Sequence, residues 1–376
     1  MKPGKILLVA NTDWYLFNFR LALARFLKSQ GLDVVMVAPD GTYAREIEAN
    51  GFRFIAWNVG RQTMSPRGEL QAVSQLVKIY QSEHPVLVHH FTIKPVLYGS
   101  LAARYAKIKA VVNSVTGLGY VFLKEGWKGK LIRTVILPLY HYAFSYPHIR
   151  VTFENENDQA TFRKLRLLKT GKSVVIRGAG VDADYYHPVP EPSLPVPLIV
   201  FPARMLFDKG LGTLVEAARI LKRRTQARFA LVGDTDPGNP TTADESMLRG
   251  WEQEGLVEWW GFKKDMRSVY QNCNIVTLPS FGEGLPTVLI EAAACARPIV
   301  TTDVAGCRDV VIDGVNGFLV PPNQPEALAQ AIESLINEPE QRLNMGKAGR
   351  QIVLDTFTNK QVNQGIFEIY REVLGQ

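Results

Sequence analysis

Two acidic residues bracket a glycine-containing turn in the second half of the chain. Glu283 lies within PSFGEGLPTVLIEAAACARPIV (279–300), and Glu291 follows it with seven residues between them. We expect a strand to end at Pro279 and a helix to begin near Leu285, so that Glu283 lies in the turn and Glu291 on the helix. A carboxylate before the helix can accept hydrogen bonds from sugar hydroxyls, and one on the helix can bind a ribose diol.

The start of this helix is a predicted anion site. Pro286 suits the first helical turn, because proline has no N–H group to leave unpaired there. Exposed backbone N–H groups and the helix dipole favour a negative group, most naturally a diphosphate. The residues expected to present these groups are Gly284, Leu285 and Thr287. The alternative is a capped core helix with a single acidic turn residue.

A pair of cations forms the second candidate feature, in FPARMLFDKG (201–210). Arg204 follows an expected strand, and Lys209 is expected to open a helix. Two cations at the carboxyl edge of a sheet suit a diphosphate and the negative charge that develops on it as a leaving group. Taken alone, the pair fits a solvated surface role better. Its place in the same half as Glu283 favours the binding role.

Short apolar runs alternate with longer amphipathic stretches along the whole chain. The runs are rich in Val, Ile and Phe with little alternation, which is typical of strands buried on both faces of a parallel sheet. Expected strands are 5–10, 34–38, 52–57, 86–90, 110–114, 151–154, 173–176, 198–203, 228–233, 257–262, 274–279 and 297–302, and expected helices include 16–29, 69–81, 95–107 and 360–374. The fold class is therefore α/β, with helices on both faces of each sheet.

A proline-rich stretch, YYHPVPEPSLPVP (185–197), interrupts the alternation and predicts an extended linker. We expect two doubly wound, Rossmann-like domains, 1–188 and 189–357, with a C-terminal helix at 358–376 that packs back on the first. Ligands of such sheets bind at the carboxyl ends of the strands, so we expect the two domains to face a central cleft.

Composition and charge exclude several classes of protein. The chain has 376 residues, 46% hydrophobic and 21% charged, which excludes disordered, collagen-like and coiled-coil proteins. Residues 1–188 carry 25 basic and 13 acidic residues, a net charge of +12, whereas 189–376 carry a net charge of −5. The basic half indicates an anionic partner: nucleic acid, a membrane surface or a phosphorylated substrate. Three cysteines in one half indicate a reducing compartment, and we expect neither a signal peptide nor a membrane-spanning helix.

A basic segment beside an apolar stripe in the first half has two interpretations. The cations belong to 100–135, and the stripe is Trp127, Leu131, Ile132, Val135, Ile136, Leu139 and Tyr140. The stripe either lies on an anionic membrane surface or faces the core of the first domain. A nucleic-acid partner is not expected, because the cations lack interleaved exposed aromatic residues and no base-reading motif occurs.

The motifs resemble those of one known family. Glu283 and Glu291 resemble the E-x7-E motif of the retaining family 4 glycosyltransferases, which have the GT-B architecture. ARMLFDKG, IRGAGVDADYYHP (176–188) and DVAGCRDVVIDGVNGFLVPP (303–322) also resemble family elements. FTIKPVLYG (91–99) and NSVTGLGYVFL (113–123) resemble a subgroup that includes bacterial N-acetylhexosaminyl transferases acting on undecaprenyl-diphosphate-linked glycans.

The resemblance implies a role for each site residue. Glu283 would bind the transferred sugar and Glu291 the ribose, while Arg204 and Lys209 would bind the leaving diphosphate. His90 would lie near the transferred sugar. The remaining contacts, to phosphates or sugar, would come from Gly284, Leu285, Thr287, Gly117 and Gly119.

The resemblance also implies the reaction and the partners. The donor would be a UDP-sugar, the acceptor a saccharide on a polyprenyl diphosphate, and the transfer would retain configuration without a metal or other cofactor. The protein would be cytoplasmic and peripheral on the inner face of the membrane. Two alternatives stay open: a transferase to a soluble acceptor, and a nucleotide-sugar epimerase of the same fold.

Two features stand apart from this interpretation. The segment after the first strand, NTDWYLFNFR (11–20), lacks the glycines that many relatives carry near the phosphates, and Asp13 or Arg20 could instead contact the acceptor. Asp13 fits a helix-capping role equally well. The D-x-D patterns at 182–184 and 234–236 match a metal motif of another glycosyltransferase architecture, but so short a pattern is common by chance, and we expect no metal site.

Overall fold

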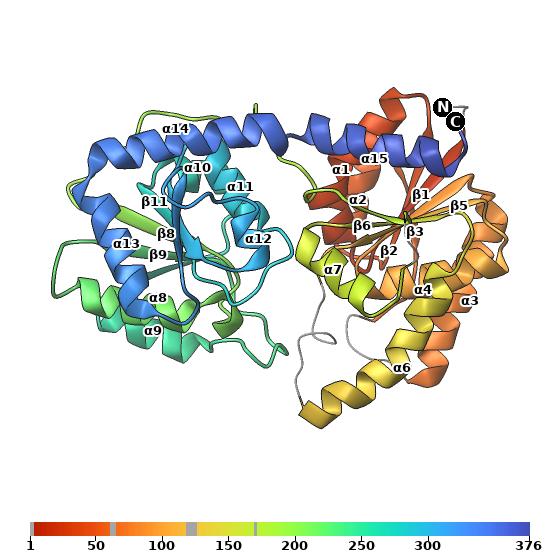
Figure 1. The fold of residues 1–376 in the computed structure, drawn as a ribbon, viewed down its shortest axis with the longest axis horizontal. Coiled ribbons are helices and arrows are strands. Elements are labelled where there is room, and N and C mark those ends of the chain that lie inside the picture. The colour runs from red at the N-terminus through yellow and green to blue at the C-terminus, as the bar shows by residue number, and fades with distance from the viewer. Residues whose placement is uncertain (1–3, 61–64, 118–125, 169–170) are drawn as a thin grey trace. The chain divides into compact units, whose positions relative to one another are not determined.

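The computed structural model describes residues 4–60, 65–117, 126–168 and 171–376. The chain forms two compact units (Figure 1), of which the first comprises Met1–Gly180 with Asn359–Gln376 and the second Val181–Thr358. The division therefore falls after Gly180 rather than after residue 188. The C-terminal segment belongs to the first unit.

The described residues of the first unit form a parallel sheet of seven strands in the order β3-β2-β1-β4-β5-β6-β7. The order reverses between β1 and β4, which makes the sheet doubly wound, as predicted. The strands are β1 (Lys5–Val9), β2 (Asp33–Ala38), β3 (Arg53–Ala56), β4 (Leu87–Phe91), β5 (Ala110–Val115), β6 (Ile149–Phe153) and β7 (Ser173–Val175).

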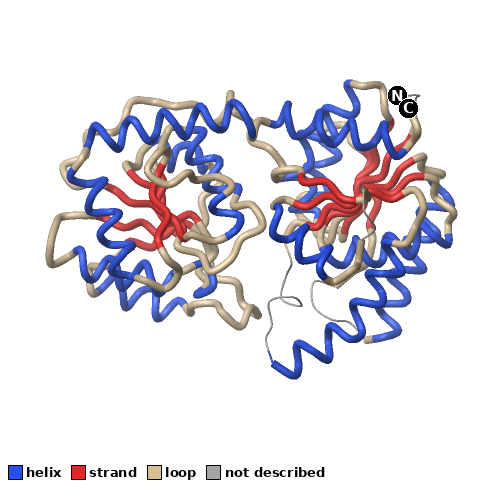
Figure 2. Tube along the Cα trace, viewed as in Figure 1, coloured by secondary structure: helices blue, strands red, loops and turns tan. Residues whose placement is uncertain are grey.

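Helices cover both faces of this sheet (Figure 2) and bury a separate apolar core on each. One core is closed by α3 (Pro66–Glu83), α4 (Ile93–Tyr105), α6 (Gly126–Phe144) and α7 (Glu156–Lys164). The other is closed by α1 (Asp13–Ser29), α2 (Ala44–Ala49) and α15 (Asn359–Val373). Apolar side chains point to both faces because each strand is sandwiched between helices, which explains the unbroken apolar runs in the sequence.

The last helix, α15, is an integral part of the first unit. Its Phe367 ring meets Phe26 of α1 edge to face, with the ring centroids 5.8 Å apart. The Tyr370 hydroxyl lies 2.6 Å from His89 Nδ1 in β4, and His89 Nε2 lies 2.7 Å from Ser114 Oγ in β5. All three side chains are buried, so α15 is joined to the sheet by a satisfied polar network as well as by apolar contacts.

The second unit repeats the doubly wound pattern in its described residues, with six parallel strands in the order β10-β9-β8-β11-β12-β13. Five of these strands were expected, and β13 lies in a segment, 303–322, that was recognised only by resemblance. The strands are β8 (Leu198–Pro202), β9 (Arg228–Val232), β10 (Glu258–Gly261), β11 (Ile275–Leu278), β12 (Ile299–Thr302) and β13 (Gly317–Val320).

The helices of the second unit close one continuous core on both faces of its sheet. On one face α8 packs against α13, and on the other α11 packs against α14 (Figure 1). The helices are η1 (Phe207–Lys209, 3-10), α8 (Leu211–Leu221), α9 (Glu245–Gln253), α10 (Met266–Gln271), α11 (Thr287–Ala294), α12 (Ala305–Arg308), α13 (Pro325–Asn337) and α14 (Pro339–Thr356).

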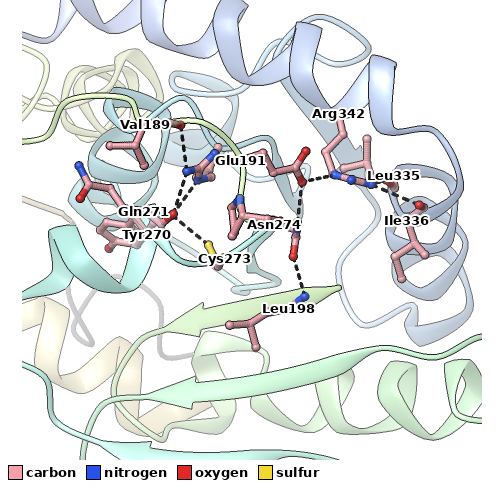
Figure 3. Close-up of polar contacts among 12 residues, drawn as sticks. Val189, Glu191, Leu198, Tyr270, Gln271, Cys273, Asn274, Leu335, Ile336 and Arg342 are labelled. Atoms are coloured by element: carbon pink, nitrogen blue, oxygen red, sulfur yellow. Dashed lines mark hydrogen bonds and ion pairs between the residues drawn. The ribbon is translucent and has the colours of Figure 1, made fainter. Parts of the chain in front are cut away.

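The proline-rich linker is irregular, as predicted, but it is fixed along the second unit (Figure 3). Glu191 accepts hydrogen bonds from Asn274 Nδ2 at 2.6 Å and from Arg342 Nε at 2.5 Å. Arg297 donates to the backbone oxygens of Val189 and Tyr270. Polar side chains thus take the place of the backbone hydrogen bonds that the prolines cannot make.

In the described part of the apolar stripe, Ile136 and Tyr140 pack against the core of the first unit, and Leu139 faces solvent. Tyr140 of α6 is fully buried against Phe144 and Phe162, whereas Leu139 is 40% exposed. The side chains at 127, 131, 132 and 135 lie outside the described residues. In the described part of the chain, no helix is long and apolar enough to span a membrane.

We predict that Arg342→Ala lowers the free energy of unfolding of the second unit by about 3 kcal/mol, because it leaves the Glu191 carboxylate without its buried cation. The Arg342 and Glu191 side chains are 9% and 19% exposed. Hydrogen exchange of β8 and β11 in increasing urea measures the change. The control is Arg224→Ala, whose pairs with Glu326 and Glu333 are exposed and long, at 3.9 and 3.7 Å. It should cost less than about 1 kcal/mol, and equal losses in both variants would contradict the prediction.

Candidate active site

The candidate site lies where the strand order of the second unit reverses. Strands β8 and β11 are neighbours in the sheet, and their crossover connections leave in opposite directions. Such a point leaves a crevice at the carboxyl ends of the two strands, where doubly wound sheets bind their ligands. The segment after β8 carries Arg204 and Lys209, and the segment after β11 carries Glu283. The fold therefore brings to one edge residues that are more than seventy positions apart in the sequence.

A single glycine allows the two segments to meet. Gly210 follows η1 with φ of 81°, and a Cβ atom there would lie 1.9 Å from the backbone oxygen of Pro279. The contact is reinforced by the backbone oxygen of Asp208, which accepts from Phe281 N at 2.9 Å and from Ser280 Oγ at 3.2 Å. Only glycine combines this left-handed backbone with so close an approach.

Lys209 and Glu283 form a bidentate ion pair as a result. Lys209 Nζ donates to Glu283 Oε1 at 2.7 Å and to Oε2 at 2.8 Å. The two side chains are 23% and 11% exposed, so the pair is shielded yet reachable. The cation and the carboxylate lie side by side, which is the arrangement needed to bind an anionic leaving group and the hydroxyls of the group attached to it.

The helix after the turn begins later than predicted. Helix α11 starts at Thr287 with Pro286 as its N-cap, not near Leu285, because the proline adopts an extended backbone conformation with ψ of 99°. The preceding turn is supported by Gly306 of α12, where a Cβ atom would lie 2.4 Å from the Gly284 oxygen. Leu285 is buried in the core, so it can offer a ligand only its backbone, whereas Thr287 is partly exposed.

Glu291 lies in the second turn of α11 beneath two tyrosines. The Tyr270 hydroxyl donates to Glu291 Oε2 at 3.1 Å. Burial raises the pKa of Glu291 to about 7, although hydrogen bonds from Tyr270 and Tyr186 oppose the shift. The carboxyl group therefore changes its charge near neutral pH. The sequence did not predict this pKa shift, because it reveals neither the burial of Glu291 nor its two tyrosine partners.

Arg204 forms an ion pair with Asp236, from the loop after β9. Both carboxylates of the D-x-D pattern at 234–236 thus have partners within the protein. Asp236 pairs with Arg204, and Asp234 Oδ1 accepts a hydrogen bond from Phe262 N at 2.9 Å. In the other pattern, Asp182 Oδ1 accepts from the backbone N–H groups of Asp184 and Tyr185 and shapes a turn. Among the described residues, no group of three or more His, Cys, Asp or Glu side chains could hold a metal ion.

Comparisons with known proteins agree with this geometry. The family model described as "Glycosyl transferase 4-like" matches residues 5–150, and the model "Glycosyl transferases group 1" matches residues 196–338. Both units are therefore accounted for. The chain belongs to the family 4 glycosyltransferases.

Curated relatives extend over nearly the whole of this glycosyltransferase. The N,N'-diacetylbacillosaminyl-diphospho-undecaprenol alpha-1,3-N-acetylgalactosaminyltransferase of Campylobacter jejuni is 29% identical over 371 residues, 96% of this chain and 96% of the relative. The capsular polysaccharide biosynthesis glycosyltransferase CapM of Staphylococcus aureus is 24% identical over 93% of this chain and 92% of its own.

Solved structures share the fold. Anabaena HepE in complex with UDP has a TM-score of 0.80 at 20% identity, over 98% of this chain and 100% of that chain. A glycosyltransferase from Rickettsia africae has a TM-score of 0.79 at 20% identity, over 100% and 99%. The predicted GT-B fold class is thereby confirmed.

The glycosyltransferase's first unit holds the remaining predicted site residues. His90 is fully buried at the end of β4, with Nε2 2.9 Å from the Tyr80 hydroxyl and Nδ1 2.7 Å from Asn113 Oδ1. Burial lowers its pKa to about 4. Both ring nitrogens are thus engaged by protein groups in this conformation. Gly117 has φ of 113°, a glycine conformation, and Gly119 lies outside the described residues.

The two polar residues after β1 serve the structure of the first unit. Asp13 is buried and accepts hydrogen bonds from Tyr43 N at 2.7 Å and Ala44 N at 3.1 Å, at the start of α2. Arg20 is 2% exposed and lies over the Phe91 ring, 4.4 Å from its centroid. The capping alternative for Asp13 therefore holds at the start of α2, and Asp13 Oδ1 also accepts from Trp14 N at 2.8 Å in the first turn of α1.

Sequence reasoning missed the residues that support the site. Gly210 was quoted within a motif without a role, Tyr186 and Tyr270 were not singled out, and Asp236 was weighed only as a metal ligand. A glycine directly after the motif lysine was the one visible signal, because glycine marks close backbone approach.

We predict that Gly210→Ala abolishes most activity, because its Cβ would displace the Pro279 backbone and separate Lys209 from Glu283. The strained φ alone costs roughly 1–2 kcal/mol, and turnover should fall at least about a hundredfold if one charged contact is lost. Gly212→Ala is the matched control. Gly212 lies in α8, and a Cβ atom there would meet only the Phe207 ring, at 3.4 Å. Turnover and melting temperature should both be measured. Wild-type turnover in Gly210→Ala would show that the close approach is dispensable.

Proposed function

We propose that this glycosyltransferase moves an N-acetylhexosamine, such as GalNAc or GlcNAc, from a UDP-sugar to a saccharide linked to a polyprenyl diphosphate. The observation that carries the proposal is the shielded Lys209–Glu283 pair at the switch point of the second unit. The cation can bind the diphosphate, and the carboxylate beside it can accept hydrogen bonds from the hydroxyls of the transferred sugar. The Campylobacter relative, whose name specifies an undecaprenol-linked acceptor and GalNAc transfer, supports the choice of substrates.

Each site residue has a role in this proposal. Arg204 and Lys209 bind the diphosphate, aided by backbone groups of Gly284, Leu285 and Thr287 at the start of α11. Glu283 binds hydroxyls of the transferred sugar, and Glu291 binds the ribose. His90 is proposed to lie near the transferred sugar, with its ring held in place by Tyr80 and Asn113.

The proposed chemistry is transfer with retention and without a metal. The bond between the anomeric carbon and the β-phosphate oxygen breaks, and its electron pair leaves with UDP. The acceptor hydroxyl attacks the same face, and its proton passes to the departing phosphate oxygen. Positive charge grows on the sugar next to the Glu283 carboxylate, while negative charge grows on the diphosphate next to Lys209 and Arg204. Fixed charges of both signs are therefore aimed at the developing charges, and the two cations take the part that a metal plays elsewhere.

The proposed site of action is the cytoplasmic face of the membrane, with the protein bound peripherally. A polyprenyl tail keeps the acceptor in the bilayer, so the enzyme must approach the surface. The net charge of +12 over residues 1–188 supports attraction to anionic lipids.

We predict that Lys209→Ala and Glu283→Gln each lower turnover roughly a hundredfold to a thousandfold, because each removes a charge aimed at the transition state. The donor is first chosen by thermal shift from a panel of UDP-, GDP- and ADP-sugars, since the true donor raises the melting temperature. Turnover is then followed as UDP release, with and without a lipid-linked acceptor in phosphatidylglycerol-containing vesicles. Glu254→Ala, which breaks an exposed pair with Arg219, is the control and should retain wild-type turnover. Near wild-type rates in both site variants would refute the assignment. Equal release without the acceptor would refute the lipid-linked substrate.

We predict that donor affinity falls as the pH is lowered from 8 to 6, because Glu291 has a pKa of about 7 and becomes protonated. Hydroxyl groups bind a carboxylate more tightly than a neutral carboxyl, by about 1 kcal/mol, so the loss should be roughly fivefold. A UDP-sugar is the right probe for the titration, because its diphosphate diester does not itself titrate in this range. Glu291→Gln should bind weakly at both pH values. If Glu291→Gln kept the wild-type pH dependence of donor binding, Glu291 would be excluded as the group that causes it.

A further inference from the structure

The carboxylate of Asp236 has no place in the roles assigned so far. Asp236 belongs to the D-x-D pattern Asp234-Thr235-Asp236, and its carboxylate pairs with the Arg204 guanidinium. Asp236 is 21% exposed and Arg204 is 51% exposed. An ion pair as open as this contributes little to stability. Its presence beside a proposed diphosphate site therefore calls for an explanation other than stability.

The loop that carries Asp236 is fastened to the segment that carries the two cations. Met205 N donates to the backbone oxygen of Asp234 at 3.0 Å, and Phe207 N donates to that of Thr241 at 2.7 Å. Ala243 N donates to the backbone oxygen of Met205 at 2.8 Å. These bonds tie the loop to both sides of the segment. Three backbone hydrogen bonds therefore join the loop to the cation segment.

The backbone of Asp236 is itself held in place. Its backbone N–H donates to Thr242 Oγ1 at 3.0 Å, so the loop closes on itself beneath the carboxylate. Arg204, by contrast, has a long side chain with several freely rotating bonds and would lose orientation without a partner. Asp236 accepts from Nη1 only, and the guanidinium has five N–H donors in a planar fork. One edge is anchored, and half of the side chain remains open to solvent.

From this arrangement we propose that Asp236 is a positioning residue, which holds the guanidinium of Arg204 so that its other edge faces the leaving diphosphate. The inference rests on the proposed function, because it assumes that Arg204 binds the diphosphate. Orientation matters most when charge builds on the leaving group, so Asp236 acts on turnover more than on donor binding. A carboxylate near an anion also repels it. If Asp236 merely competed with the donor for Arg204, its removal would raise affinity instead.

The test compares wild type with Asp236→Ala, Asp236→Asn, Arg204→Ala and the double variant Arg204→Ala/Asp236→Ala. The assay is UDP release from the donor chosen in the thermal-shift panel. Asp236→Ala should lower kcat about tenfold with less than about a threefold change in KM, the pattern of an interaction that matters in the transition state. Asp236→Asn should stay within about threefold of wild type, because its amide oxygen still accepts the Nη1 hydrogen bond. The double variant should match Arg204→Ala, because Asp236 acts only through Arg204.

Two further variants keep the test decisive. Thr242→Val removes the acceptor beneath Asp236 and should lower kcat by a smaller factor, about threefold, even if Asp236→Ala fails to fold. Glu216→Ala breaks a comparably exposed ion pair with Arg219 on α8 and should leave kcat unchanged. Unchanged or increased kcat in both Asp236→Ala and Thr242→Val overturns the inference, as does a loss in the double variant that is the product of the two single losses.

The two proposals fail in different ways. If Arg204→Ala has wild-type turnover, the role of Arg204 in the proposed function is wrong, and the inference is overturned with it. If Arg204→Ala is impaired but Asp236→Ala and Thr242→Val are not, the proposed function stands and the inference alone is wrong.

Discussion

The approach of Gly210 to the Pro279 backbone is the constraint on which the candidate site depends. At this point the segment after β8 lies against the segment after β11, with no room for a side chain between them. Two features of the site follow from that contact. It fixes the Asp208 oxygen over Ser280 and Phe281, and it brings the Lys209 ammonium to the Glu283 carboxylate. The strand order of a doubly wound sheet creates the crevice, and the glycine at 210 lets the two segments that line it come into contact.

In the proposed function, the opposite charges at this crevice serve the chemistry rather than stability. A partly buried ion pair is a weak source of stability, because the desolvation of both charges offsets their attraction. In the pairs Lys209–Glu283 and Arg204–Asp236, a carboxylate holds each cation in position. The diphosphate of a bound donor would then meet cations that are already oriented, and its sugar would meet the Glu283 carboxylate. Less reorganisation of the protein is then needed during the reaction.

Much of the fold could be predicted from the sequence, because the signal was local. Unbroken apolar runs such as Leu198–Pro202 lie within one strand, and a strand buried on both faces requires them. The start of α11 was predicted two residues early, since Pro286 can either open a helix or precede it, and in the structure it precedes the helix in an extended conformation. Strand β13 was not identified from its own residues, and its pairing with β12 defines it.

The sequence alone determined the inventory of the site: two carboxylates spaced along a turn and a helix, and two cations after a strand. These spacings are short-range, and the chemistry of each side chain is fixed by its type. Only the tertiary structure decided which of them meet. It paired Lys209 with Glu283 and Arg204 with Asp236, placed Glu291 under two tyrosines, and enclosed His90 between Tyr80 and Asn113. Contacts of this kind depend on the order of strands in a sheet and on the packing of neighbouring loops. Both are properties of the whole fold, which no local spacing encodes.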